Sequence, residues 1–277
     1  MATSTASPLT GLRPGPLTAY WRFQRAVAKA QLAAWLPAAR RLLVDISGPA
    51  ANCPAQAALA GHAVVRVVTA HPGRPVPGER RPTGERPTGR RRPTGGRQAP
   101  SGRVAPVVAE PGSLAFLDAG CVDGVIAEDG ALSRHLMTED LVAEIARVLR
   151  PGGELLACVD SLVLGMAMLA ERHQWAHLTD LPHAEVVLLP WPDGTITRCF
   201  GAGQLYDLLT EAGLEVTSIW PRTVLSPSTV DYVLRKQPGA MDRLVRAELQ
   251  ADQDPVAEAG SDEAFGISLV ATARKPR

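Results

Sequence analysis

The chain has 277 residues, of which 45% are hydrophobic and 21% charged, and its formal net charge is +1. This apolar content suffices for a sizeable core and excludes a wholly disordered chain. A net charge so near zero excludes a surface that is cationic throughout, of the kind that binds nucleic acid or membranes.

The first predicted element is a helix at residues 17–36, whose apolar side chains recur at helical spacing. Pro37 ends this helix, and we expect residues 1–40 to form an N-terminal tail and helical lid. Strands are predicted at 42–46 and 64–68, with a short helix at 54–60 between them. This strand–helix–strand order is the opening of an α/β unit.

Most of the positive charge lies in the next segment. Residues 71–103 contain nine arginines and two glutamates, a formal charge of +7, which leaves −6 for the rest of the chain. The segment also has seven prolines, seven glycines and three copies of Arg-Pro-Thr-Gly. Such a composition cannot offset the entropy of ordering, so we predict a disordered insertion. It could contact nucleic acid, but it lacks the aromatic residues of a single-strand binder, and we favour a solvated insertion without a nucleic-acid partner.

Alternation of strands and helices resumes after the insertion. A helix at 138–149 is expected to begin at Thr138 as N-cap and to end before Pro151-Gly152-Gly153. The other predicted elements are strands at 104–108, 123–127 and 154–159, a helix at 162–175, a hairpin at 186–189 and 195–200, a helix at 205–211, a strand at 214–220, helical residues 229–249 and a strand at 267–273. The pattern predicts an α/β fold with a mostly parallel sheet and helices on both faces.

Several classes of site and location are disfavoured. None of the four cysteines forms a Cys-x-x-Cys pair, and His173 and His177 lack an evident third ligand, so we expect no metal site. The longest apolar run, 162–170, is far shorter than the roughly 20 residues of a membrane helix. Residues 1–10 lack the pattern of a secretory signal, so a cytoplasmic protein is expected.

Candidate ligand-binding residues follow the strands, because ligands of such sheets bind beyond the carboxyl ends of the strands. The first strand runs into Asp45-Ile46-Ser47-Gly48-Pro49, a turn of small residues before a helix. Its N–H groups could hold an anion, or the segment could be only a tight turn. The other residues in such positions are Thr69, Glu110, Glu128, Asp129, Asp160 and Ser161.

Three blocks of sequence stand out: EPGSLAFLDAGCVDGVIA at 110–127, EIARVLRPGG at 144–153 and LLTEAGLEV at 208–216. Together they resemble the class I S-adenosylmethionine-dependent methyltransferases. The second block is fairly specific, and the other two support it. The resemblance covers roughly residues 41–275 and implies a Rossmann-like domain at 41–277 with a seven-stranded sheet, S-adenosylmethionine as cofactor and methyl transfer as activity.

The resemblance also implies cofactor contacts. The methionine part would lie at Asp45, Ser47, Gly48 and Pro49, the ribose at Thr69 and the adenine at Glu110. Glu128 and Asp129 would lie where the fourth strand opens onto cofactor and substrate. Two positions depart from the family's pattern: the first loop keeps a single glycine, and Thr69 replaces the usual acid. A neutral hydrogen bond is about half as strong as a charge-assisted one, so weaker cofactor binding is expected.

Methyl transfer mainly requires alignment of the reacting atoms, and a general base only where the acceptor must lose a proton. His135 is a candidate base, although a surface or capping role is the simpler interpretation. We expect a small-molecule acceptor, bound under the N-terminal helix and residues 229–249. The alternative is a non-catalytic binding protein that keeps the fold and has lost strong cofactor binding. A nucleic-acid methyltransferase is a weaker third hypothesis.

Overall fold

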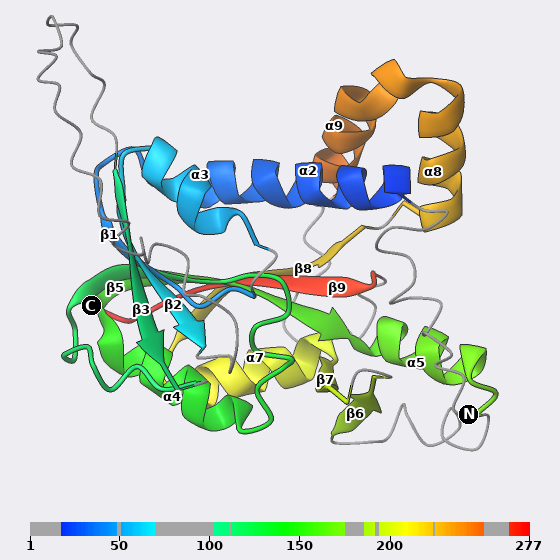
Figure 1. Ribbon diagram of the computed structural model, residues 1–277. Helices are drawn as coiled ribbons and strands as arrows, with labels where there is room; N and C mark the ends of the chain where they lie inside the picture. Colours follow the sequence, from blue (N-terminus) through cyan, green and yellow to red (C-terminus); the bar gives the residue numbers. More distant parts are fainter. Residues whose placement is uncertain are drawn as a thin grey trace, which may run out of the picture.

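The computed structural model describes residues 18–48, 51–69, 102–110, 112–174, 186–191, 194–223, 225–251 and 266–277. A central sheet is covered by helices on both faces (Figure 1). The helices are α2 (Thr18–Trp35), α3 (Cys53–Leu59), α4 (Thr138–Val148), α5 (Leu162–Glu171), α7 (Ala202–Glu211), α8 (Pro227–Lys236), η2 (Pro238–Ala240) and α9 (Met241–Ala251). The strands are β1 (Leu42–Asp45), β2 (Ala63–Thr69), β3 (Arg103–Ala109), β4 (Val122–Ala127), β5 (Leu149–Ser161), β6 (Val187–Pro190), β7 (Ile196–Phe200), β8 (Glu215–Arg222) and β9 (Ser268–Arg274).

The sheet has the expected mostly parallel core. Strands β3, β2, β1, β4 and β5 are parallel neighbours in that order, and β9 joins antiparallel between β5 and β8. These seven strands are the predicted sheet. The β6–β7 hairpin extends it, because Asp160 and Ser161 at the end of β5 pair with Cys199 and Phe200 of β7. The sheet in the described residues therefore has nine strands.

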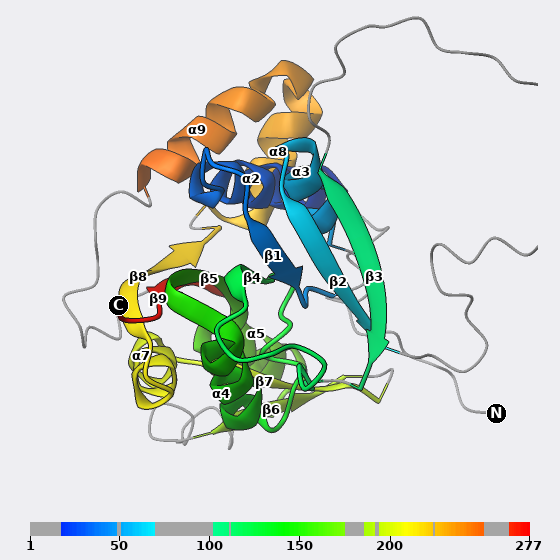
Figure 2. The same ribbon diagram turned by 90° about the vertical axis from the view of Figure 1, so that its left-hand side faces the viewer.

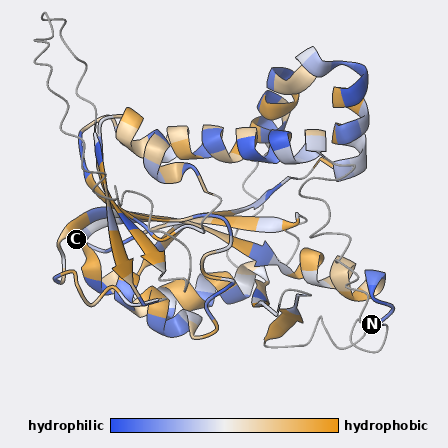
Figure 3. Ribbon diagram, viewed as in Figure 1, coloured by the Kyte–Doolittle hydropathy of each residue, from blue (hydrophilic) through white to orange (hydrophobic). Residues whose placement is uncertain are grey.

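Each face of the sheet carries its own hydrophobic layer. The apolar sides of α4 and α7 pack on one face, where Ile145 and Leu209 are fully buried. On the other face α2 and α3 bury Leu32 and Ala57 against the strands. The two layers lie on opposite sides of the sheet in Figure 2. The strands between the two layers are mostly hydrophobic (Figure 3), as expected for a sheet whose two faces are both covered by helices.

The N-terminal helix lies over the sheet and joins a second set of helices. Tyr20, Phe23 and Val27 of α2 are buried against Val230 and Leu234 of α8. The helix α9 also contacts α2, so the predicted lid consists of α2 supported by the helical segment 227–251 (Figure 1).

Two local expectations are corrected. Thr138 is not the N-cap of α4: it is the first helical residue, and its hydroxyl donates to the carbonyl of His135 at 2.6 Å. The strand predicted at 154–159 begins earlier, because β5 already starts at Leu149, which pairs with Val122 ahead of a register shift. The helix α4 still ends before Pro151, as predicted. Of the predicted insertion at 71–103, residues 71–101 lie outside the described residues, and Arg103 is already the first residue of β3.

Candidate functional site

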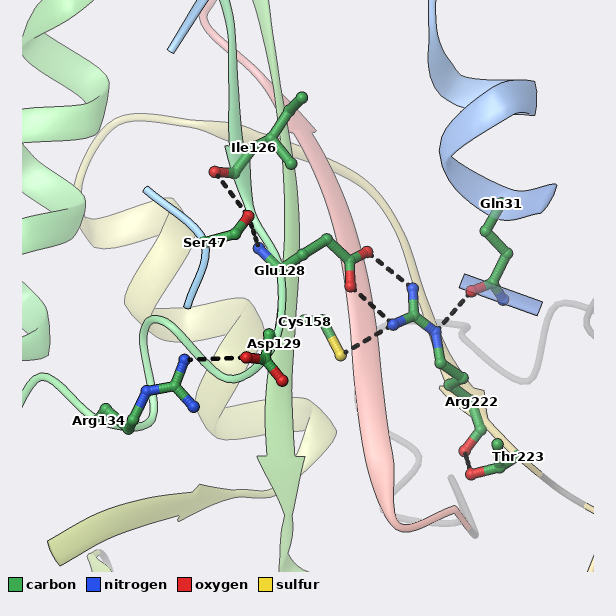
Figure 4. Close-up of polar contacts among 9 residues, drawn as sticks. All are labelled: Gln31, Ser47, Ile126, Glu128, Asp129, Arg134, Cys158, Arg222 and Thr223. Carbon is green, nitrogen blue, oxygen red and sulfur yellow. Dashed lines mark hydrogen bonds and ion pairs between the residues drawn. The ribbon is translucent and has the colours of Figure 1, made fainter. Parts of the chain in front are cut away.

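The loop after β1 is bound to the end of β4. The Ile46 N–H donates to the Ile126 carbonyl at 2.9 Å, and the Gly48 N–H donates to the Glu128 carbonyl at 3.4 Å. The Ser47 hydroxyl accepts from the Glu128 N–H at 2.9 Å and also lies 3.5 Å from the Ile126 carbonyl, to which it donates (Figure 4). These bonds place Asp45 and the residues after β4 at one edge of the sheet. Pro49 lies outside the described residues.

Asp45 is a buried carboxylate at the end of β1. It is 1% exposed, and in the part of the chain that the structure describes neither of its oxygens has a hydrogen-bond partner. Burial raises the pKa of Asp45 to about 6, against the opposing effects of the Ser47 hydroxyl and the charge of Arg66 on β2. A buried polar group without a partner is costly, so this oxygen pair is suited to a ligand that brings donors or positive charge.

Glu128 is engaged within the protein. Both of its carboxylate oxygens accept from Arg222 at the end of β8, each at 2.8 Å, and both side chains are almost fully buried. The Arg222 guanidinium also donates to Gln31 of α2 at 2.6 Å and to the Cys158 sulfur at 3.4 Å (Figure 4). Arg222 thereby connects the N-terminal helix α2 to the ends of β4 and β8. The carboxylate of Glu128, which the resemblance assigned to the cofactor, is bound to Arg222 instead.

The neighbouring Asp129 points to a different partner. Its carboxylate lies 3.8 Å from the Arg134 guanidinium, and the two side chains remain 24% and 34% exposed. Asp129 has φ 57°, a left-handed conformation that is uncommon for a residue other than glycine and that clusters at functional sites. A Cβ on Gly48 would lie 2.2 Å from Arg134 Nη2 and 2.5 Å from Asp129 Oδ2, so a side chain at this position would push the ends of these two side chains aside.

The ribose and adenine candidates lie at the ends of β2 and β3. Thr69 is the last residue of β2 and pairs with Ala109 of β3. Glu110 follows β3 and is exposed. His135, the candidate base, lies against the turn after β3, because a Cβ on Gly112 would meet its ring at 2.1 Å. The structure thus brings His135 next to the turn that carries Glu110.

Sequence reasoning missed three residues of this edge: Gln31, Arg134 and Arg222. Arg222 is fully buried, and a buried arginine normally requires a partner. The sequence offered one indication of this role: Arg222 follows shortly after the strand predicted at 214–220, and the candidate site lies at the carboxyl ends of the strands. The signal for Arg134 was its place five residues after Asp129, in the turn that follows β4.

The described residues contain neither a candidate metal site nor a candidate membrane span. No group of three His, Cys, Asp or Glu residues in those ranges could hold a metal ion. Within the same ranges, no helix has the length and apolar character needed to cross a membrane.

Known proteins resemble this chain in structure and not in sequence. No family model matches it, and neither does any curated protein sequence. An S-adenosylmethionine-dependent methyltransferase from Methanosarcina mazei is 15% identical with a TM-score of 0.51, covering 89% of this chain and 97% of its own. The 1,6-didemethyltoxoflavin-N1-methyltransferase of Burkholderia thailandensis, solved with 1,6-didemethyltoxoflavin and S-adenosylhomocysteine, is 16% identical with a TM-score of 0.52, covering 92% of this chain and 79% of its own. The chain therefore has the class I methyltransferase fold, as predicted from the sequence.

Proposed function

We propose that the protein is an S-adenosylmethionine-dependent methyltransferase that transfers a methyl group to a small-molecule acceptor. The observation that carries this proposal is the buried, unpartnered carboxylate of Asp45 at the end of β1. The cofactor is a zwitterion with an additional sulfonium charge, and a cationic ligand beside Asp45 would relieve the cost of burying that carboxylate.

The remaining strand ends support the same ligand. Glu110 at the end of β3 offers an exposed carboxylate that can accept from an adenine amino group. Asp129 at the end of β4 is partly exposed beside the loop after β1. The Burkholderia thailandensis enzyme, which has this fold, acts on a small molecule, and this likeness supports an acceptor of similar size.

In this proposal the bound cofactor supplies a methyl group that is already activated on sulfur. The protein then has to align the acceptor with that group and exclude water. The Arg222 contacts to Glu128 and Gln31 fix α2 over the ends of β4 and β8. We place the acceptor under this helix and the α8–α9 segment, and His135 remains the candidate base if the acceptor must lose a proton.

The test is isothermal titration calorimetry of the purified protein with S-adenosylmethionine and with S-adenosylhomocysteine. We expect saturable binding of both. Glu110→Ala should weaken binding by about 1.5–3 kcal/mol, the range for a hydrogen bond to a charged group. Asp242→Ala, which removes an exposed carboxylate from α9, should leave the affinity unchanged. Folded wild-type protein that gives no heat at millimolar cofactor would refute the proposal.

A second candidate is a non-catalytic binding protein, and one observation favours it. The N–H groups of Ile46 and Gly48 are already bonded to carbonyls at the end of β4, so the loop has few donors left for a cofactor carboxylate. The titration separates the two candidates, because loss of cofactor affinity in the folded protein is the expected result for the second. Binding of both compounds together with methyl transfer to a trial acceptor supports the first.

A further inference from the structure

Several donors of the loop after β1 are already used within the described residues. Besides the engaged N–H groups of Ile46 and Gly48, Pro49 has no N–H, and the Ala51 N–H donates to the Gly48 carbonyl at 3.0 Å. The Ser47 hydroxyl is used by Glu128. A donor from another part of the chain would therefore strengthen the binding of a negatively charged group at this position.

Arg134 provides a positive charge at this place. Its guanidinium lies against Gly48, as the 2.2 Å from a Cβ at that position to Nη2 shows. Its ion pair with Asp129 is 3.8 Å long, which is beyond hydrogen-bond distance, and the side chain is about one-third exposed. The guanidinium can therefore pair with a ligand carboxylate without first breaking a short hydrogen bond to Asp129.

The backbone that carries Arg134 is fixed from several sides. The Arg134 N–H donates to the Gly130 carbonyl at 3.1 Å, and the adjacent Ser133 is fully buried. The Ser133 hydroxyl accepts from the Asp160 N–H at 2.8 Å, and its carbonyl accepts from the Arg198 N–H at 2.7 Å. These bonds join the turn to β5 and β7, so the backbone that carries Arg134 is positioned before a ligand binds.

We propose that Arg134 and Asp129 form the subsite for the amino-acid end of the cofactor. The Arg134 guanidinium binds the α-carboxylate, in place of the donors that a glycine-rich loop would provide, and the Asp129 carboxylate binds the α-ammonium group. This assignment rests on the proposed function, because it presupposes that the cofactor binds. A glycine at position 48 fits this assignment, because a side chain there would displace the Arg134 guanidinium and the Asp129 carboxylate.

The test compares two ligands that differ in the amino-acid end. S-adenosylhomocysteine carries this end, and 5′-deoxy-5′-methylthioadenosine has the same nucleoside and a thioether but lacks it. Arg134→Met should weaken binding of S-adenosylhomocysteine by about 10- to 100-fold, as expected for a lost charge-assisted hydrogen bond, and should leave the affinity for methylthioadenosine within about twofold. The matched control is Arg243→Met at an exposed position of α9, which should change neither affinity.

A second pair of variants guards against a misfolded Arg134→Met. Gly48→Ala keeps both charges but displaces the guanidinium, and Asp129→Asn removes the partner of the ammonium group; each should weaken only S-adenosylhomocysteine. Equal weakening of both ligands by Arg134→Met, unchanged binding of S-adenosylhomocysteine, or tighter binding would overturn the assignment. Wild-type protein that binds neither ligand would overturn the proposed function, and the assignment with it.

Discussion

Replacing Asp45 by asparagine should stabilise the protein in the absence of ligand. The carboxylate is buried without a hydrogen-bond partner in the described part of the chain, and burial raises its pKa from 3.8 to about 6. At 1.36 kcal/mol per pKa unit, the ionised form costs about 3 kcal/mol of folding free energy at neutral pH. Asparagine has nearly the same shape and does not ionise, so it avoids this cost.

The stabilisation by Asp45→Asn must depend on pH in a defined direction. A raised carboxyl pKa means that the folded state holds its proton longer, so stability is lost as the pH rises from about 4 to about 6. Asp45→Asn should therefore melt about 6–12 °C above wild type at pH 7.5, at roughly 2–4 °C per kcal/mol. At pH 4.5 the stabilisation should shrink to about 1 kcal/mol, because the wild-type carboxyl is then mostly protonated in the folded state.

The assay is a thermal melt of both proteins at the two pH values, without ligand. Asp207→Asn serves as the matched control, because Asp207 is exposed on α7 and its replacement should not shift the melting temperature. A lower melting temperature for Asp45→Asn at pH 7.5 would show that the carboxylate has a stabilising partner. The same gain at both pH values would show that its ionisation is not the cause.

Three further predictions concern stability and reactivity. Arg222→Met should lower the free energy of unfolding in urea by about 3–5 kcal/mol, because it leaves Glu128 as an uncompensated buried charge. The double variant with Glu128→Met should recover most of this loss. If the losses of the two single variants simply add, the pairing is contradicted. Ser226→Ala should cost about 1 kcal/mol in the same assay, because the Ser226 hydroxyl accepts from the Thr229 N–H at the start of α8, and Ser226→Gly should cost less. In native protein only the exposed Cys121 should react quickly with a thiol reagent, and rapid labelling of Cys121→Ser would argue against this. Burial raises the pKa of each of the other three thiols, Cys53, Cys158 and Cys199.

The order of elements followed from local patterns. The helix expected at 17–36 is found at Thr18–Trp35, and the strand expected at 104–108 is found at Arg103–Ala109. Both are set by the spacing of apolar residues within a few turns or pleats, which is visible in a single segment. The same reasoning places Asp45 and Glu110 at strand ends, because the carboxyl ends of parallel strands share one edge of the sheet.

Which partner each of these carboxylates has was decided only by the tertiary structure. Glu128 and Asp129 are adjacent, yet one is paired with Arg222, 94 residues later, and the other faces Arg134. That difference depends on the position of β8, which pairs with β9, while β9 pairs with β5. Both pairings are antiparallel, so β8 runs parallel to β5, and no local sequence pattern contains this strand order. The sequence alone thus predicted the edge of the sheet at which these residues lie, and long-range packing determined that Glu128 is paired with Arg222.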